Sequence, residues 1–145
     1  MRTFRTEADK LNMDLLSLHD AARRFEFQNR IIYEAVDSGA IRVVVRTTKS
    51  AFVNFVNVQK YLTERTESIL RNRDDSEFIT LREAQHEFGL KKWVISYATA
   101  KMPNDEGGIA TIYRNDHRYA KLGDLRRFVL WHIANRPSYG EPVDA

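Results

Sequence analysis

The chain has 145 residues, 43% of them hydrophobic, and a formal net charge of +3. It contains no cysteine, which excludes disulfides, thiolate zinc sites and cysteine nucleophiles. No apolar run approaches the roughly 18 residues of a membrane span, and the first residues lack the apolar core of a signal peptide. We therefore expect a cytoplasmic protein with no membrane partner, whose small positive charge permits nucleic-acid binding without requiring it.

An N-terminal arm and a capped helix are the first predicted elements. Residues 1–14 are mostly polar and mixed in charge, and we expect them to form an N-terminal arm or a short helix. Ser17 and Asp20 have the spacing of an N-cap hydroxyl and an acid three positions further on, so they predict a helix over 18–25. Phe25 lies on the apolar face of that helix, and we expect it in the core.

A second helix and a β-hairpin follow. A turn at Glu26 leads to an amphipathic helix over 28–38, and Gly39 suits the left-handed residue that often ends a helix. The β-branched and aromatic runs at 41–46 and 51–56 flank a short polar turn, which is typical of a hairpin.

A third helix closes the first module, which we place at residues 15–72. We expect Asn57 as the N-cap of this helix and an extension of the helix through Leu70. The polar run at 72–76 marks the boundary to the next module.

The same order of features is repeated 63 positions later. Thr80 and Glu83 repeat the capping pair, Phe88 matches Phe25, and Gly89 stands where the first copy has Glu26. The matching elements are expected at 81–88, 91–101, 107–113 and 118–122, followed by a third helix capped by Asp124. We place the second module at 77–134 and a flexible tail at 135–145.

These elements predict a mainly α-helical α+β fold with small β-hairpins, built from two tandem modules. Each module consists of two helices joined by a short turn, a hairpin and a closing helix. Because the apolar and capping positions repeat while the solvent-facing positions differ, the two copies are expected to share a fold and to differ in surface function.

The pattern resembles the excisionase and MerR-type family of winged helix-turn-helix proteins. Residues 26–39 are similar to that family's turn, recognition helix and closing Ser-Gly, and a hairpin follows them. Two positions depart from the family pattern: Glu26 occupies the place of the usual turn glycine, and Met102-Pro103 replaces the equivalent of Gly39. The resemblance implies tandem winged helix-turn-helix modules that bind double-stranded DNA sequence-specifically, with the second helix in the major groove and the hairpin wing on the backbone.

The resemblance also implies which residues contact DNA. In the recognition helices these are Gln28, Asn29, Arg30, Tyr33, Glu34, Lys91, Lys92, Trp93, Ser96 and Tyr97. In the wings they are Arg42, Arg46, Lys49, Arg114, His117 and Arg118. Arg can form two hydrogen bonds with guanine, Asn or Gln can do so with adenine, and Lys suits phosphate. No cofactor is implied.

Some of these residues also have an ordinary structural interpretation. The aromatic side chains of Tyr33, Trp93 and Tyr97 could equally cover another protein surface. The four histidines lack the spacing of metal ligands, and no nucleophile, base and orienting group occur together. We therefore expect no metal site and no enzymatic activity.

Together these features predict a phage or mobile-element regulator in the cytoplasm of a bacterial or phage-infected cell. The role would be that of an excisionase-like recombination directionality factor or a transcriptional regulator, with a recombinase, a polymerase or a terminase as protein partner. The chain is expected as a monomer or a weak homo-oligomer. Two alternatives stay open: a winged-helix protein-protein interaction module, and a small terminase-type DNA-packaging subunit.

Overall fold

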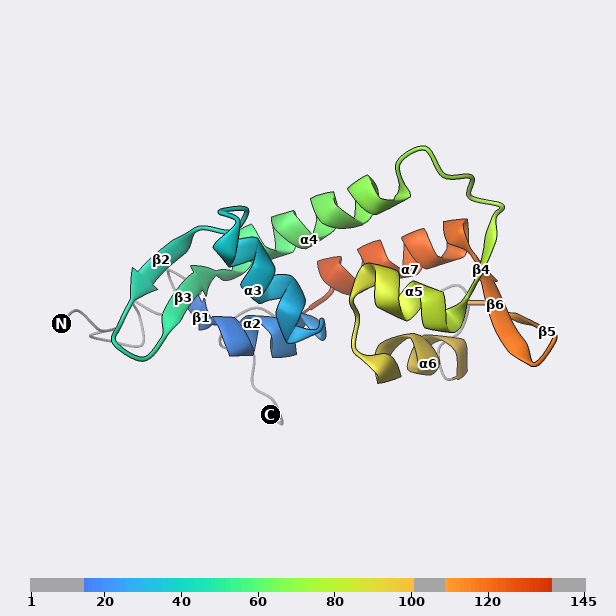
Figure 1. Ribbon diagram of the computed structural model, residues 1–145, viewed down its shortest axis with the longest axis horizontal. Coiled ribbons are helices and arrows are strands. Elements are labelled where there is room, and N and C mark those ends of the chain that lie inside the picture. Colours follow the sequence, from blue (N-terminus) through green and yellow to red (C-terminus); the bar gives the residue numbers. More distant parts are fainter. Residues whose placement is uncertain (1–14, 101–108, 137–145) are drawn as a thin grey trace. The chain divides into compact units, whose positions relative to one another are not determined.

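The computed structural model describes residues 15–100 and 109–136. These residues form six helices and two antiparallel three-stranded sheets (Figure 1). The described residues divide into two compact units: residues 15–61 with Arg136 form unit 1, and residues 62–100 with 109–135 form unit 2. The expected arm at 1–14, the substitution at Met102-Pro103 and most of the expected tail lie outside the described residues.

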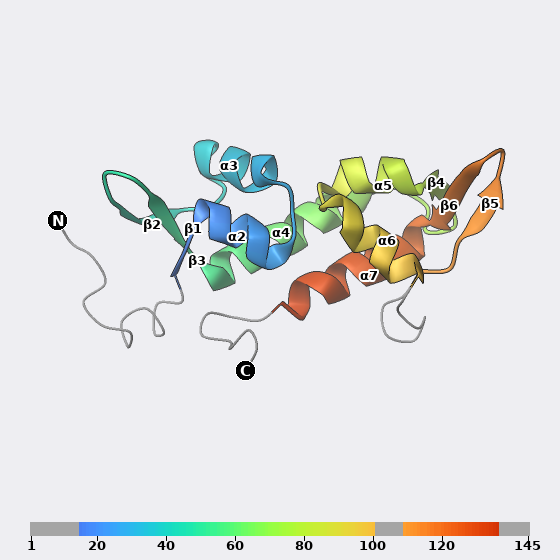
Figure 2. The same ribbon diagram turned by 90° about the horizontal axis from the view of Figure 1, so that it is seen from below.

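Both halves of the chain have the same order of elements: a strand, two helices, two strands and a helix. In the first half these are β1 (Leu15–Ser17), α2 (Leu18–Phe25), α3 (Asn29–Asp37), β2 (Val43–Arg46), β3 (Ala51–Asn54) and α4 (Phe55–Leu70). In the second half they are β4 (Phe78–Thr80), α5 (Leu81–Phe88), α6 (Lys92–Ala100), β5 (Ile112–Arg114), β6 (His117–Lys121) and α7 (Leu122–Ala134). Figure 2 shows the two helices that follow the first strand in each half.

The first strand of each half was not expected from the sequence. β1 pairs with β3, where Leu16 lies opposite Val53, and β4 pairs with β6, where Ile79 lies opposite Ala120. All four of these side chains are buried. The hairpin is therefore part of a sheet in strand order β1-β3-β2 or β4-β6-β5, and the added strand fixes the hairpin to the start of the following helix.

The two capped helices form as predicted. The Ser17 hydroxyl accepts a hydrogen bond from the Asp20 backbone N–H at 3.1 Å. Thr80 and Glu83 form a complete capping box, with the Thr80 hydroxyl accepting from the Glu83 N–H at 3.0 Å and the Glu83 carboxylate from the Thr80 N–H at 2.9 Å. The backbone N–H of Thr80 and then its hydroxyl lower the pKa of Glu83, because both donate to the charged carboxylate.

The turns after these two helices have the same left-handed backbone conformation. Gly89 ends α5 with a positive φ of 77°, and Glu26 ends α2 with a φ of 63°. Both residues take the left-handed conformation, which is strained for a residue with a side chain. The Glu26 carboxylate accepts from the Arg136 guanidinium at 2.6 Å, and this pair belongs to unit 1. Gly39 also has a positive φ, 85°, as expected for its position after α3.

The N-caps predicted for α4 and α7, the closing helices of the two halves, are wrong. The Asn54 side chain, rather than that of Asn57, caps α4 by accepting from the backbone N–H groups of Val56 and Asn57 at 2.8 and 3.2 Å. α7 begins at Leu122, so Asp124 lies inside its first turn and not at the cap. The helices start earlier because their first residues, Phe55 and Leu122, are buried in the core.

The strands are shorter than expected. β2 and β3 occupy only part of the ranges 41–46 and 51–56, although the hairpin forms where it was predicted. β5 begins at Ile112, whereas the sequence favoured a strand over 107–113; residues 107–108 lie outside the described part.

The long helix α4 belongs to both units. Its start contributes to unit 1, where the Phe55 ring stacks on Phe25 with 4.9 Å between ring centroids. Its second half belongs to unit 2, where the Arg65 guanidinium donates to the backbone carbonyls of Phe88 and Glu87 at 2.6 and 3.2 Å. These carbonyls end α5 and would otherwise lack intrahelical partners. The boundary between compact units thus falls after Tyr61, whereas we expected the first module to extend to residue 72.

Candidate nucleic-acid interface

The helix α3 has a polar face directed to solvent. Asn29, Arg30, Tyr33 and Glu34 are exposed, whereas Gln28 is half-buried at the N-cap position. The opposite face of α3 is in the core of unit 1, with Ile31, Ile32 and Ala35 buried. The expected assignment of the two faces of this helix agrees with the exposure of its residues.

One of these side chains is held in place by its neighbour. The Arg30 Nε donates to the Gln28 side-chain oxygen at 2.9 Å. This hydrogen bond uses one donor of the guanidinium, and a guanidinium carries five N–H donors. The bond to Gln28 restricts the orientation of the Arg30 guanidinium on the exposed face of α3.

The hairpin of unit 1 adds cations. Arg46 ends β2 and Lys49 lies in the turn, and both are exposed. The turn is fixed by Thr47, whose hydroxyl accepts from the Ser50 backbone N–H at 3.0 Å and donates to the Ser50 carbonyl at 3.2 Å. Arg42 precedes β2 and is also exposed.

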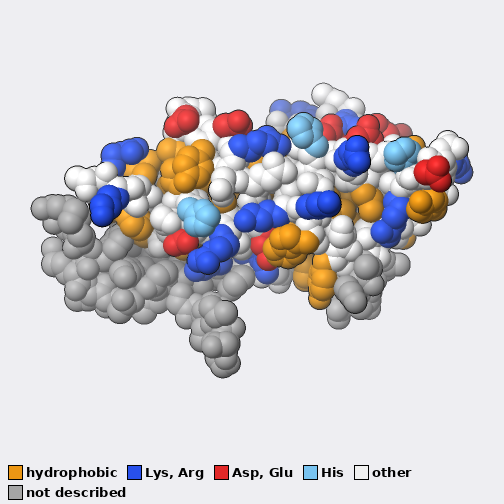
Figure 3. Space-filling view, turned by 60° about the horizontal axis from the view of Figure 1, so that its bottom comes forward, with side chains coloured by type: hydrophobic (Ala, Val, Ile, Leu, Met, Phe, Trp, Pro, Cys, Tyr) orange, Lys and Arg blue, Asp and Glu red, His pale blue; other side chains and the backbone are white. Residues whose placement is uncertain are grey.

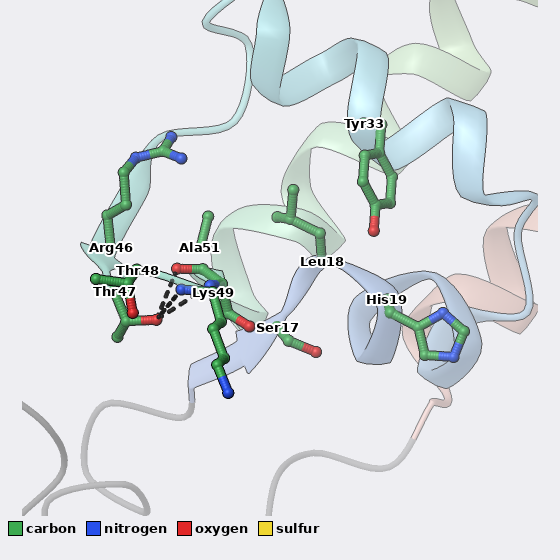
Figure 4. A pocket seen from close by; sticks show the side chains of 10 residues that line it. Ser17, Leu18, His19, Tyr33, Arg46, Thr47, Thr48, Lys49 and Ala51 are labelled. Atoms are coloured by element: carbon green, nitrogen blue, oxygen red, sulfur yellow. Dashed lines mark hydrogen bonds between the residues drawn. The ribbon is translucent and has the colours of Figure 1, made fainter.

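A cleft of about 330 Å³ lies between the β2–β3 hairpin and the helices α2 and α3 of unit 1. Figure 4 shows the hairpin residues on one side of this hollow and Tyr33 with Leu18 on the other. The cleft is lined by Ser17, Leu18, His19, Tyr33, Arg46, Thr47, Thr48, Lys49, Ser50 and Ala51. Hydroxyl groups, a histidine, an arginine and a lysine thus share a concave surface, a donor set that fits the oxygens of an anion.

The cleft brings some expected residues together and leaves others outside. Tyr33, Arg46 and Lys49 line it, whereas Asn29 and Arg30 do not. Sequence reasoning missed the contributions of Ser17, His19 and the two threonines of the turn. The only sequence signal for this group was the cap at Ser17, because the pairing of β1 with β3 is what brings the start of α2 toward the hairpin.

The exposed face of α6 differs in chemistry from that of α3. Lys92, Trp93, Ser96 and Tyr97 are exposed, and Lys91 is half-buried just before the helix. Val94, Ile95 and Ala98 are buried on the other side. Exposed aromatic rings therefore replace the amide and guanidinium groups of α3.

The hairpin of unit 2 is also basic but has an acidic residue at its tip. Arg114, His117 and Arg118 are exposed, as expected. Asn115 and Asp116 form the turn with positive φ values of 53° and 66°, the combination typical of a two-residue type I′ hairpin. The Arg118 guanidinium donates to the Thr111 hydroxyl at 3.2 Å.

The described part of the chain was also compared with the requirements of a metal site and of a membrane span, and it meets neither. No group of three or more histidine, cysteine, aspartate or glutamate side chains there could hold a metal ion. Over the same residues, no helix has both the length and the apolar character needed to cross a membrane.

Comparison with known proteins adds no relative. The chain matches no protein-family model, no curated protein and no solved structure.

Proposed function

We propose that the chain binds double-stranded DNA sequence-specifically through two tandem winged helix-turn-helix modules. In this proposal α3 enters the major groove, and the β2–β3 hairpin contacts the backbone beside it. The chain acts by binding rather than by catalysis, as an excisionase-like recombination directionality factor or a transcriptional regulator of a phage or mobile element.

The observation that carries the proposal is the exposed face of α3 beside a cationic hairpin. A major groove about 12 Å wide admits a helix, and the side chains on the free face of α3 are of the types that read base edges. Arg30, oriented by Gln28, has N–H groups suited to guanine, and Asn29 can pair with adenine.

The cleft of unit 1 supports backbone binding at the same site. Arg46 and Lys49 supply positive charge, and the hydroxyls of Ser17 and Thr48 can donate to phosphate oxygens. Contacts of this kind position a protein on DNA without reading its sequence.

The second module would add contacts of its own. Lys91 and Lys92 on α6 and Arg114 and Arg118 on the hairpin suit phosphates. Because both modules are in one chain, binding of the first raises the effective concentration of the second at an adjacent half-site.

The test compares two arginines of unit 1. After preferred sites are selected from genomic fragments, Arg30→Ala should weaken the preferred duplex by about 1–3 kcal/mol and change binding to random duplex little. Arg23→Ala removes the same charge from α2, where the side chain is 71% exposed and paired with Asp20, and should leave discrimination intact.

Lys49→Ala tests the backbone contact. It should weaken preferred and random duplexes equally and reduce the dependence of log affinity on log salt by about one unit. If the unmodified protein is not retained on any duplex at about 0.1 M salt, the proposal fails and the alternative of a protein-protein interaction module takes its place.

A further inference from the structure

The exposed side of α6 has two aromatic rings that the core of unit 2 does not use. The side chain of Trp93 is 53% exposed and that of Tyr97 is 55% exposed. Residues four apart lie on one side of a helix with their Cβ atoms about 5–6 Å apart. We call Lys92, Trp93, Ser96 and Tyr97, the exposed residues of this side, the α6 aromatic face.

The aromatic face is positively charged. Lys92 belongs to it and Lys91 immediately precedes the helix, while residues 90–100 contain no aspartate or glutamate. By contrast, α3 carries Glu34 and Asp37 among its exposed residues. Figure 3 shows hydrophobic and basic side chains next to one another on the part of the surface that α6 forms.

Packing in unit 2 does not account for these rings. Val94, Ile95 and Ala98 on the opposite side of α6 are at most 3% exposed, so the core of unit 2 is closed without Trp93 and Tyr97. Large exposed aromatic side chains on one helix face are typical of a binding surface. The ligand of such a surface must offer flat apolar groups to the rings and negative charge to the lysines.

We propose that the α6 aromatic face binds single-stranded nucleic acid. Trp93 and Tyr97 stack on unpaired bases, and Lys91 and Lys92 contact the phosphates between them. Aromatic side chains and a positively charged surface are the combination by which proteins hold single strands with little sequence preference. A face that contains Lys92, is preceded by Lys91 and has no acid complements a polyanion and not a neutral apolar partner.

This activity goes beyond the proposed binding of duplex DNA. The bases of an intact duplex are already stacked on one another, so the two rings can stack only where bases are unpaired. The inference depends on residues of unit 2, and α3 takes no part in it.

The experiment uses Trp93 as its own reporter. Trp93 and Trp131 are the two tryptophans of the chain, so Trp131→Phe leaves Trp93 as the only indole. In this background, oligothymidine of about 20 nucleotides should quench the fluorescence of Trp93 saturably, as expected for a ring stacked on bases. An abasic deoxyribose-phosphate oligomer of the same length should bind more weakly and quench little.

Variants separate stacking from charge. Trp93→Ala should weaken binding of labelled oligothymidine roughly 5- to 100-fold in fluorescence anisotropy, and Trp93→Phe should restore most of the affinity. Tyr113→Ala removes a 70% exposed ring from β5 and should leave the affinity unchanged. Because Trp93 is exposed, circular dichroism should show the same fold for all three variants.

Several results would overturn the inference. The first is that the abasic oligomer or polyglutamate quenches Trp93 as strongly as oligothymidine does. The second is that Trp93→Ala leaves the affinity for oligothymidine unchanged. The third is that the protein self-associates in sedimentation without nucleic acid and that this association depends on Trp93. The last would assign the face to a second copy of the chain. Loss of duplex binding with retained single-strand binding would refute the proposed function alone, and Arg30→Ala should have no effect on oligothymidine.

Discussion

The buried ring of Phe25 should contribute strongly to the stability of unit 1. Its side chain is 0% exposed, so Phe25→Ala removes its full burial and leaves a cavity, a change that lowers the free energy of unfolding by about 3–5 kcal/mol. The ring also stacks on Phe55 with 4.9 Å between centroids, and such a pair adds about 0.5–1.5 kcal/mol. We therefore expect a loss in the upper half of that range, about 4–5 kcal/mol.

The loss is large compared with the total stability of a small domain, about 5–15 kcal/mol. Urea unfolding followed by far-ultraviolet circular dichroism measures it, and amide hydrogen exchange shows whether α2 and α3 are the elements that open. Phe25→Leu keeps most of the volume and should lose less than about 1.5 kcal/mol. Tyr113→Ala, at a 70% exposed site, should change stability by less than about 0.5 kcal/mol. A loss below about 1 kcal/mol for Phe25→Ala would mean that the face of α2 is assigned wrongly.

Three further predictions concern unit 2. Gly89→Ala should lower the free energy of unfolding by about 1–2 kcal/mol in urea melts, because its φ of 77° is strained for alanine; an unchanged melt would contradict the left-handed turn. Replacing glycine by alanine inside a helix usually raises the free energy of unfolding by up to about 1 kcal/mol. Gly123→Ala should not show this gain in urea melts, because a Cβ there would lie 3.0 Å from the Cβ of Asp75; a stabilised variant would show that the Asp75 loop moves freely. The lowered pKa of Glu83 gives stability that is present above the ordinary value of 4.5 and lost as the pH falls through the lower folded value. Glu83→Gln should therefore flatten the thermal stability of the protein against pH in that acidic window, and an unchanged profile would exclude this carboxylate as a source of acid sensitivity.

Features that depend on neighbouring residues could be predicted from the sequence. The caps at Ser17 and Thr80 and the left-handed end at Gly39 involve residues three or four positions apart, so a short window of sequence contains all their partners. The exposed and buried faces of α3 follow from the same local periodicity. For this reason the exposed positions of the candidate recognition residues could be predicted, although their ligand could not.

Features that depend on distant residues were decided by the tertiary structure. The strands β1 and β4 have three residues each, too few for an alternating pattern, and they exist because β3 and β6 pair with them. The start of α4 was predicted too late because Phe55 is fixed by its stack on Phe25, a contact that periodicity does not contain.

The candidate site also combines features set by neighbouring residues with features set by distant residues. The sequence by itself determined two copies of one element order and the polar or aromatic character of each exposed helix face. Only the tertiary structure decided that Ser17, His19 and the hairpin turn line one cleft, because the pairing of β1 with β3 brings together residues about thirty positions apart. It also decided that α4 serves both compact units, since Phe55 stacks on Phe25 in unit 1 whereas the buried Leu62 and Leu70 belong to unit 2.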